Sequence, residues 1–240
     1  MCTLSKQGNI FTLTLTGDDD HRLNPTLIAA VSSALQTIKS QAKHGSVLIT
    51  TSHGKFFSNG FDLAWAKKTA AETGRSAMDG LREMVASFKP VTAQMISLPM
   101  PTIAVVQGHA AAAGFLFALS HDYVYMRSDR GVLYMSEVDI GLPLPDYFSA
   151  AFRDKVYDVA ARRDVLLRGV KVKGDAAVKM GIVDAAYDSE EKLTEATVRL
   201  AQELGNKKWD GYCYQEIRKS LYPDLCGVLG LVEGKLVAKL

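Results

Sequence analysis

Two loops rich in small residues could together bind a negatively charged oxygen through backbone N–H groups. In the first, at residues 56–63, Gly60 can adopt a conformation that turns a following N–H outward. In the second, at residues 108–114, four alanines precede Gly114 and an apolar stretch follows. Small side chains let a ligand approach the backbone, and the start of a following helix offers unpaired N–H groups. One donor from each loop could hold a single oxygen, although each loop alone is more typical of a helix packed on a sheet.

The elements that must position these loops follow from hydrophobic periodicity. Both loops come after short apolar runs, which are typical of fully buried strands, and an alternating stretch near the N-terminus predicts a half-buried strand. Apolar residues at helical spacing predict two long helices, the first capped by Asn24 with Pro25 at its first position. The predicted strands cover residues 10–15, 47–50 and 102–106, and the predicted helices cover 25–38 and 76–96, with an interruption at Pro90. Strands that alternate with helices indicate an α/β fold with a largely parallel sheet covered on both faces.

The chain becomes mainly helical after residue 151. Helical spacing recurs at residues 159–167, 176–180, 193–204 and 213–221. No repeat, low-complexity tract or linker separates this part from the rest. We therefore expect a core over residues 1–190 and a C-terminal helical segment over 191–240, without a second independent domain.

Composition favours a single-core protein with a local ligand site. A chain of 240 residues with 48% hydrophobic content can bury one substantial core, and 28 basic against 26 acidic residues give no field that favours nucleic acid or an anionic membrane. The most apolar stretch, at 110–119, is shorter than the about 20 residues that span a bilayer. The three cysteines lie far apart, without metal-ligand spacing. We expect a soluble protein that is not secreted, with no nucleic-acid partner, membrane insertion or bound metal.

Four blocks of the sequence resemble the enoyl-CoA hydratase/isomerase (crotonase) family in order and spacing. Residues 56–63 (FFSNGFDL) resemble the pattern small polar, Gly, any residue, Asp, aliphatic, and residues 101–110 resemble Pro-small-Ile-Ala-aliphatic-x-x-Gly-x-Ala. Residues 134–143 are similar to the Pro-Glu-x-x-x-Gly-x-x-Pro region, and 166–184 to a later helix-turn segment. The resemblance covers roughly residues 10–205. It implies a crotonase-like ββα spiral with a mainly helical C-terminal part, an acyl-CoA thioester substrate and a homotrimer, which could pair into a hexamer.

The same resemblance assigns roles to individual residues. It implies that the backbone N–H groups of Phe61 and Ala113 form an oxyanion hole, with Gly114 as a one-residue alternative to Ala113. It implies that Glu137 is the catalytic carboxylate. The implied substrate-binding residues are Ser58, Asn59, Gly60, Leu63, Gly114 and Leu116. No cofactor is expected, because coenzyme A is part of the substrate.

One glutamate in place of two indicates the reaction. Hydratases of this family use a second glutamate, and Leu116 stands at its position in this chain. A single base suits removal of a proton from C2 of a 3-enoyl thioester and its return to C4. The resemblance therefore predicts isomerisation of 3-cis- or 3-trans-enoyl-CoA to 2-trans-enoyl-CoA, in β-oxidation of unsaturated fatty acids.

Two alternative functions remain open from the sequence. A hydratase or thioester hydrolase on the same fold could use Asp146 with Glu137, although we favour a helix cap for Asp146. A non-catalytic acyl-CoA-binding protein would have kept only the pocket. The run Ser120-His121-Asp122 has the letters of a catalytic triad, but successive helical residues point in different directions. His109 is more typical of a packed or hydrogen-bonded residue than of a ligand.

Cations and the C-terminus suggest two further contacts. The phosphates of coenzyme A need positive charge, and the candidates are Lys55, Lys67, Lys68, Arg218 and Lys219. The final tripeptide Ala238-Lys239-Leu240 resembles the Ser-Lys-Leu type of peroxisomal address, which a receptor reads at a free C-terminus. The sequence therefore predicts a peroxisomal protein that binds a peroxisomal import receptor.

Overall fold

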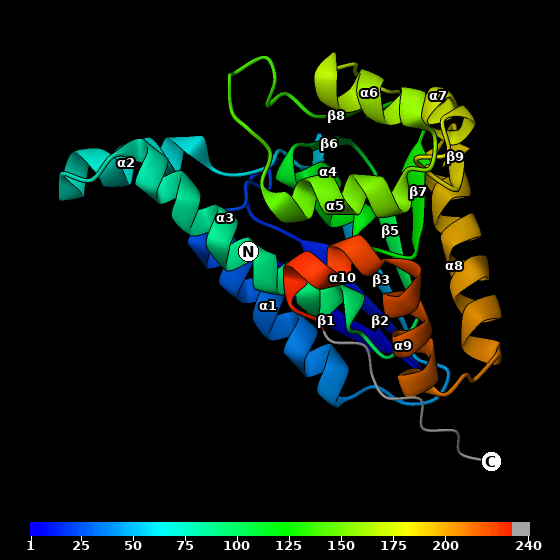
Figure 1. The fold of residues 1–240 in the computed structure, drawn as a ribbon. Helices are drawn as coiled ribbons and strands as arrows, with labels where there is room; N and C mark the ends of the chain where they lie inside the picture. The colour runs from blue at the N-terminus through cyan, green and yellow to red at the C-terminus, as the bar shows by residue number, and fades with distance from the viewer. Residues whose placement is uncertain (232–240) are drawn as a thin grey trace.

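The main sheet of the protein has six strands in the order β1-β2-β3-β5-β7-β9 (Figure 1). The computed structural model describes residues 1–231, so the C-terminal tripeptide lies outside the described residues. The strands are β1 (Cys2–Gln7), β2 (Ile10–Leu15), β3 (Val47–Ser52), β5 (Thr102–Val106), β7 (Tyr123–Arg127) and β9 (Ala185–Tyr187). The β1–β2 pair is antiparallel and the other neighbours are parallel. The predicted α/β fold with a largely parallel sheet is confirmed, although the sequence pattern does not predict β1.

Both faces of the main sheet are buried. Alternate residues of its central strands point to opposite faces, so each strand contributes side chains to both. On one face, apolar side chains of β3 and β5 pack against α8 (Glu190–Asn206), which runs along the sheet in Figure 1. On the other face, Leu48 and Ala104 join a larger core that also contains side chains of the remaining long helices. The domain boundary after residue 190 stays a prediction, and α8, which begins there, is part of the packing around the sheet.

Several helices begin at a residue whose side chain caps the helix. Within residues 1–231 they are α1 (Pro25–Ser40), α2 (Leu63–Thr73), α3 (Ala77–Ile96), α4 (Ala113–Leu119), α5 (Asp146–Lys155), α6 (Val159–Leu167), α7 (Gly174–Lys179), α8, α9 (Gly211–Leu221) and α10 (Pro223–Leu229). Asn24 caps α1 as predicted, since its side chain accepts from the Leu27 N–H at 3.0 Å. Ser76 and Asp79 form a reciprocal capping box at the start of α3. Among these helices, none is long and apolar enough to cross a membrane.

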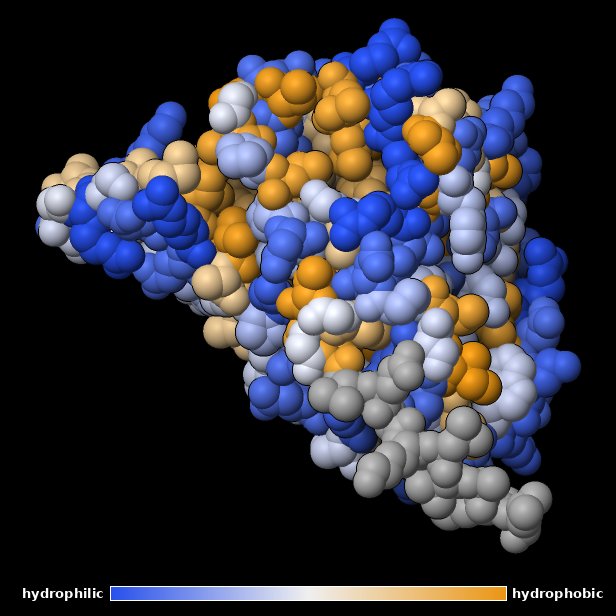
Figure 2. Space-filling model, in the orientation of Figure 1, coloured by the Kyte–Doolittle hydropathy of each residue, from blue (hydrophilic) through white to orange (hydrophobic). Residues whose placement is uncertain are grey.

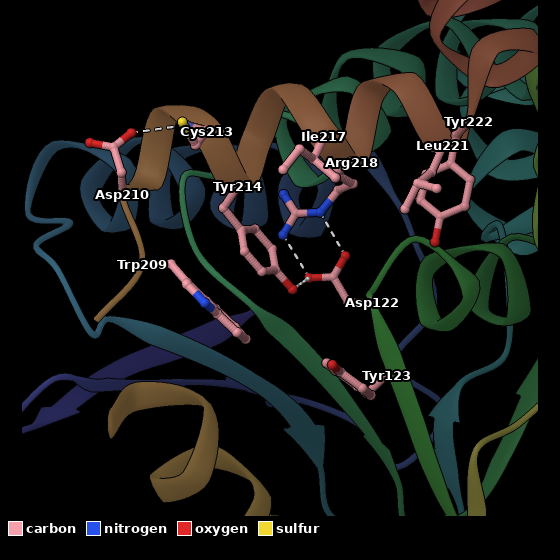
Figure 3. A pocket seen from close by; sticks show the side chains of 10 residues that line it. All are labelled: Asp122, Tyr123, Trp209, Asp210, Cys213, Tyr214, Ile217, Arg218, Leu221 and Tyr222. Carbon is pink, nitrogen blue, oxygen red and sulfur yellow. Dashed lines mark hydrogen bonds and ion pairs between the residues drawn. The ribbon is translucent and has the colours of Figure 1, made fainter. Parts of the chain in front are cut away.

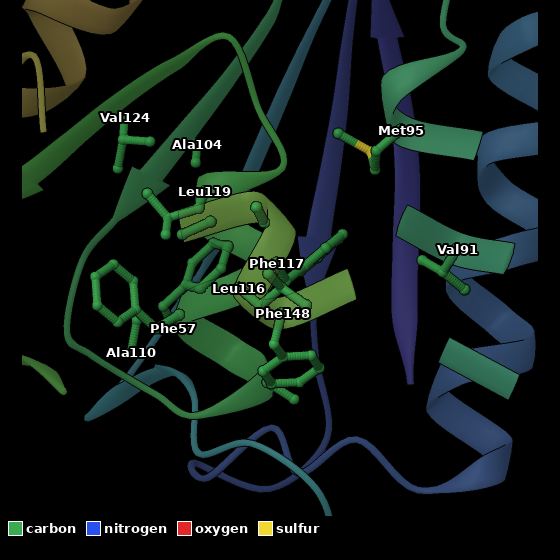
Figure 4. Close-up of a cluster of buried hydrophobic side chains, with 14 of the residues drawn as sticks. Phe57, Val91, Met95, Ala104, Ala110, Leu116, Phe117, Leu119, Val124 and Phe148 are labelled. Carbon is green, nitrogen blue, oxygen red and sulfur yellow. The ribbon is translucent and has the colours of Figure 1, made fainter. Parts of the chain in front are cut away.

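The predicted interruption at Pro90 is wrong, because α3 continues through this residue. A proline inside a helix removes one backbone hydrogen bond and costs about 3 kcal/mol. On α3 this cost is offset by burial of the apolar side chains on both sides of Pro90, including Met84, Phe88, Val91 and Met95. Figure 4 shows Val91 and Met95 on α3 beside the buried cluster. Packing therefore outweighs the local preference.

A second, smaller sheet lies beside the main one and is not predicted by the sequence pattern. Its strands are β4 (Phe56–Ser58), β6 (His109–Ala111) and β8 (Leu133–Tyr134), in the order β4-β6-β8. Both pairs are parallel. Because parallel strands end at the same edge of a sheet, the segments that follow these three strands are brought together.

The C-terminal helices are anchored by a buried arginine on α9 (Figure 3). The Arg218 guanidinium donates to both carboxylate oxygens of Asp122, each at 2.6 Å, and to the Leu98 carbonyl at 2.6 Å. Arg218 is only 3% exposed. After α9 the chain turns back, and α10 packs on α5 and α3. The interaction thus joins α9 to the loop that precedes β5 and to the start of β7.

Candidate active site

The three strands of the small sheet deliver the three groups that the sequence singles out. Phe61 follows β4, Ala113 follows β6 and Glu137 follows β8. The strands are parallel, so their carboxyl ends share one edge. At that edge, the Ala112 N–H donates to the Tyr134 carbonyl at 2.9 Å. Ala112 directly precedes the second predicted donor, and Tyr134 is in the strand that leads to Glu137. The two donors and the carboxylate are therefore held by one small scaffold.

The first predicted donor, the Phe61 N–H, is left unpaired by its own turn. The Leu23 N–H donates to the Gly60 carbonyl at 2.8 Å, and the Leu23 carbonyl accepts from the Asp62 N–H at 3.2 Å. The N–H of Phe61, between these two bonds, has no hydrogen-bond acceptor within residues 1–231. Gly60 makes this turn with a φ of +72°, a region that suits glycine.

The second predicted donor, the Ala113 N–H, lies at the first position of α4. A helix leaves its first N–H groups without intrahelical partners. The turn before it is strained, because Ala112 has a φ of +48° and a ψ of −121°. Strain of this kind costs about 1–3 kcal/mol in a residue with a side chain and concentrates at functional sites. The Ala112 carbonyl begins the helix by accepting from the Leu116 N–H at 3.0 Å, while no acceptor meets the Ala113 N–H among the described residues.

Two glycines allow these two stretches of backbone to touch. A Cβ added to Gly114 would lie 2.3 Å from the Ser58 carbonyl oxygen. A Cβ added to Gly60 would lie 3.0 Å from the Ala112 Cβ and 3.5 Å from the Ala113 nitrogen. The two unpaired donors therefore belong to directly adjoining segments, as a shared oxyanion site requires.

Glu137 lies in the turn after β8, with its backbone carbonyl accepting from the Leu142 N–H at 2.9 Å. Its Oε2 atom is buried and has no hydrogen-bond partner in the described part of the chain. Burial raises the pKa of this carboxyl, and backbone hydrogen bonds lower it by less. A carboxylate with a raised pKa and a free oxygen is suited to accept a proton from a ligand.

Phe61 and Glu137 line the same pocket, which we call the Phe61 pocket. It has a volume of about 510 Å³ and lies between α3, the segment 141–145 and Phe148 of α5. Most of its lining is apolar, with Met78, Leu81 and Val85 on the α3 side. In the view of Figure 2, apolar side chains gather in the upper part of the molecule, around the loop before α5 and around α6. Among the described lining residues, Glu137 is the only acidic one.

The remaining predicted substrate-binding residues differ in their positions. Ser58 is fully buried and its hydroxyl donates to the His21 carbonyl at 2.8 Å, while Asn59 donates to Asp20 at 3.3 Å. Leu63 lies on the surface at the start of α2. Leu116 is 0% exposed and lies within the buried cluster of Figure 4. Packing encloses the side chains of Ser58 and Leu116. That these residues bind substrate, together with Asn59, Gly60, Leu63 and Gly114, stays a prediction.

Asp146 is not the helix cap that the sequence suggests. The cap position is held by Pro145, and Asp146 is the first residue of α5. Its carboxylate pairs with the Lys89 ammonium at 2.9 Å and is 58% exposed. The hydrogen bond from Lys89 is the main reason that the pKa of Asp146 is lowered. Asp146 lines neither of the two pockets that contain Glu137.

Two of the cations predicted for the coenzyme A phosphates are engaged elsewhere. Arg218 is enclosed by Asp122 and backbone carbonyls, and Lys219 is buried and paired with Glu216 at 2.7 Å. Contacts within the protein already occupy both side chains, which argues against either of them as a phosphate ligand. Lys55, Lys67 and Lys68 are exposed and flank the loop that carries Phe61.

The remaining candidates have structural roles. His121 is fully buried, with Nε2 2.7 Å from the Thr50 hydroxyl, and Ser120 donates to the Leu116 carbonyl at 2.8 Å, so the two do not form a nucleophile–base pair. His109 packs against the Phe56 ring with 5.1 Å between centroids. Within residues 1–231, no group of three or more His, Cys, Asp or Glu side chains is arranged to hold a metal ion.

Known proteins similar to this chain agree with these observations. A family model described as enoyl-CoA hydratase/isomerase matches residues 5–221. Two Arabidopsis thaliana proteins are similar over nearly their full length. One, enoyl-CoA delta isomerase 2, peroxisomal, is 62% identical over 96% of each chain. The other, enoyl-CoA delta isomerase 3, is 60% identical over 98% of each chain.

Solved structures share the fold. An enoyl-CoA isomerase from Mycobacterium tuberculosis superposes with a TM-score of 0.82 at 17% identity, over 95% of this chain and 94% of that one. An enoyl-CoA hydratase/isomerase family protein from Pseudomonas syringae gives 0.82 at 22% identity, over 98% of each chain. The predicted crotonase-like fold is confirmed. With most of its length matched by the family model and by relatives at 60% identity or more, the chain belongs to the enoyl-CoA hydratase/isomerase (crotonase) family.

Proposed function

We propose that this protein is a Δ3,Δ2-enoyl-CoA isomerase, which converts 3-cis- or 3-trans-enoyl-CoA to 2-trans-enoyl-CoA. One observation carries the proposal: Glu137 is the only acidic residue that lines the Phe61 pocket in the described chain. The position of a second family glutamate is filled by Leu116, which is fully buried. The names of the two plant relatives, both enoyl-CoA delta isomerases, support the same reaction.

The proposed mechanism uses the two backbone donors and one base. The thioester carbonyl accepts hydrogen bonds from the N–H groups of Phe61 and Ala113, and Glu137 removes a proton from C2. The negative charge moves onto the carbonyl oxygen, where the two donors stabilise it; losing one such donor typically costs about 3–4 kcal/mol. The protonated Glu137 then returns the proton to C4, and the double bond moves to C2–C3. The raised pKa of Glu137 suits both steps, because the same group must take up the proton and release it.

The proposed reaction requires no bound cofactor. Moving a proton from C2 to C4 changes neither the oxidation state nor the atom content of the substrate, and coenzyme A enters as part of that substrate. Lys55, Lys67 and Lys68 remain the candidates for its phosphates, since all three are exposed beside the first loop. By family membership we also propose a homotrimer or a hexamer as the assembly.

We further propose that the protein acts in peroxisomes, in β-oxidation of unsaturated fatty acids. One plant relative carries the word peroxisomal in its name and is 62% identical to this chain. The C-terminal Ala238-Lys239-Leu240 provides a small-basic-Leu signal for the import receptor. These two observations are independent, because one concerns the body of the chain and the other its last three residues.

Incubation with three substrates tests the proposed reaction. The purified protein should convert 3-cis- and 3-trans-enoyl-CoA to the conjugated 2-trans product, detected by its ultraviolet absorbance. With 2-trans-enoyl-CoA it should produce little 3-hydroxyacyl-CoA and release no free thiol. Hydration without isomerisation would establish the hydratase alternative, and thiol release would establish the hydrolase. Binding without any turnover would establish an acyl-CoA-binding protein.

A further inference from the structure

A second pocket meets the Phe61 pocket at Glu137. It has a volume of about 580 Å³ and lies between the loop that carries Glu137, α5 and α6. We call it the Arg162 pocket. Both pockets are lined by Glu137 and by the segment 142–144, so this segment and the carboxylate stand at their junction. Phe61, by contrast, lines only the first pocket.

Most of the Arg162 pocket is apolar, with side chains such as Val138, Phe152 and Leu166 in its lining. This lining suits a hydrocarbon chain, since burial of apolar surface contributes about 25 cal/mol per Å². The proposed oxyanion donor Phe61 lines only the Phe61 pocket. A substrate whose thioester lies in the Phe61 pocket would therefore have C2 and C4 next to Glu137. Its acyl chain would then continue into the Arg162 pocket.

Three arginines also line this pocket, but two are already paired. Arg153 donates to Asp224 at 2.8 Å, and Arg163 pairs with Asp164 at 3.0 Å. Arg162 makes no ion pair within residues 1–231, and its Nε atom is buried without a hydrogen-bond partner. A buried donor with no partner is costly, so its presence beside a cavity points to an anionic ligand group.

The unpaired arginine is separated from the base. Glu137 and Arg162 line the same pocket, yet they form no ion pair with each other. The pKa of Glu137 is raised by burial, and no cation is among the groups that shift it. An arginine close to this carboxylate would lower its pKa instead. The two groups therefore line one pocket without being in direct contact.

We propose that Arg162 binds a carboxylate at the far end of the acyl chain, so that the enzyme accepts 3-enoyl-CoA substrates whose chain ends in a carboxylate. The inference rests on the proposed isomerase function and adds a substrate class to it. The guanidinium fork matches a carboxylate in two parallel hydrogen bonds, which would satisfy the buried Nε donor. A phosphate of coenzyme A has the same chemistry, so the test must separate these two sources.

The test compares substrates of equal chain length that end in a methyl group or in a carboxylate. We would measure kcat/KM for both with the wild-type protein, Arg162→Gln and Arg162→Lys. Arg162→Gln should lower kcat/KM for the carboxylate-ended substrate, relative to the methyl-ended one, by at least about tenfold, as expected for loss of a charged hydrogen bond. Arg162→Lys should retain part of this preference, because it keeps the charge and loses the fork.

Arg168→Gln is the matched control. Arg168 follows α6, is 64% exposed and pairs with Asp164 at 3.3 Å, and it lines neither pocket that contains Glu137. The Arg168→Gln variant removes the same charge from the same region but from outside the two pockets. The ratio of kcat/KM for the two substrates should therefore stay within about twofold of the wild type.

Several results would overturn the inference. An equal loss for both substrates in Arg162→Gln, with weaker inhibition by free coenzyme A, would assign Arg162 to a phosphate of coenzyme A. A changed mass in light scattering with an unchanged substrate ratio would assign the pocket to a contact between copies of the chain. If the wild type isomerises neither substrate, the proposed function itself fails. Calorimetry with saturated acyl-CoA ligands of both kinds would then still decide whether Arg162 selects the carboxylate.

Discussion

Glu137 and Asp122 are both carboxylates inside the protein, and their surroundings shift their pKa values in opposite directions. Burial raises the pKa of Glu137, and its backbone hydrogen bonds do not offset this. Burial also acts to raise the pKa of Asp122, but Arg218, with Lys155 and the Thr102 N–H, outweighs burial and leaves this pKa lowered. Asp122 is thus fixed as an anion with a structural role, whereas Glu137 can exchange a proton. Because the two side chains carry the same acidic group, the opposite pKa shifts come from the groups that surround each one.

The raised pKa of Glu137 predicts the pH dependence of the reaction. The base works only when ionised, so kcat/KM should be low at acidic pH and rise to a plateau as pH increases. The midpoint should lie above the ordinary glutamate value of 4.5, because burial favours the protonated form. The profile can be measured with 3-trans-enoyl-CoA, with circular dichroism at each pH as the control for folding. A midpoint at or below 4.5 would contradict this account of the site.

At the scale of elements, the close approach of α4 to β4 holds the two proposed oxyanion donors next to each other. Gly114→Ala would place a Cβ 2.3 Å from the Ser58 carbonyl oxygen, so the two segments must move apart. Displacement of one donor should reduce kcat by about a hundredfold to a thousandfold. Gly227→Ala on α10 is the matched control, since an added Cβ there meets no atom within 4 Å. Equal activity of the two variants would show that the close approach at Gly114 does not matter.

The attachment of α9 depends on the Asp122–Arg218 pair. Arg218→Met would leave Asp122 buried without its cation, which should lower the free energy of unfolding by about 3–5 kcal/mol. Urea denaturation measures this loss. Arg75→Met, which breaks the exposed ion pair with Glu83, should cost less than about 1 kcal/mol. A similarly small loss in Arg218→Met would mean that the buried pair does not hold the helix.

Elements with a clear sequence signal could be predicted, whereas those held by tertiary contacts could not. The strand at residues 10–15 and the helix after Asn24 match their predictions, because alternation and capping are local properties. The strands β4, β6 and β8 have only two or three residues each, too few to show a period, so the scaffold of the site was not predictable. The role of Arg218 was missed because its partner Asp122 is far away in sequence, and an arginine on a helix usually faces solvent.

The candidate site was predicted unevenly for a related reason. The family resemblance implies that Phe61 and Ala113 act through their backbone N–H groups, and the structure places one shortly after β4 and the other shortly after β6. Side-chain exposure depends on the packed core, so the burial of Ser58 and Leu116 could not be predicted from their neighbours in sequence. The Lys89–Asp146 pair likewise joins α3 to α5 across a turn that no local pattern predicts.

At the scale of the whole molecule, the proposed targeting signal is the C-terminal tripeptide Ala238-Lys239-Leu240. Deletion of Leu240 should abolish import into peroxisomes, because the receptor reads the free terminal tripeptide. Fluorescence microscopy of a protein tagged at its N-terminus would show this. Lys235→Ala, which leaves Ala238-Lys239-Leu240 intact, should still be imported. Unchanged import after the deletion would remove the C-terminus as the targeting signal.

The proposal that one carboxylate transfers the proton is tested most directly by the turnover of Glu137→Gln on 3-trans-enoyl-CoA, beside Asp146→Asn as a matched control. The account predicts that Glu137→Gln loses isomerase activity by about a hundredfold to ten-thousandfold, while Asp146→Asn stays close to the wild type. The raised pKa of Glu137 means that its ionised form destabilises the fold above that pKa, so the glutamine variant should melt no lower than the wild type at neutral pH. Glu137→Gln turnover within about tenfold of the wild type would contradict the assignment.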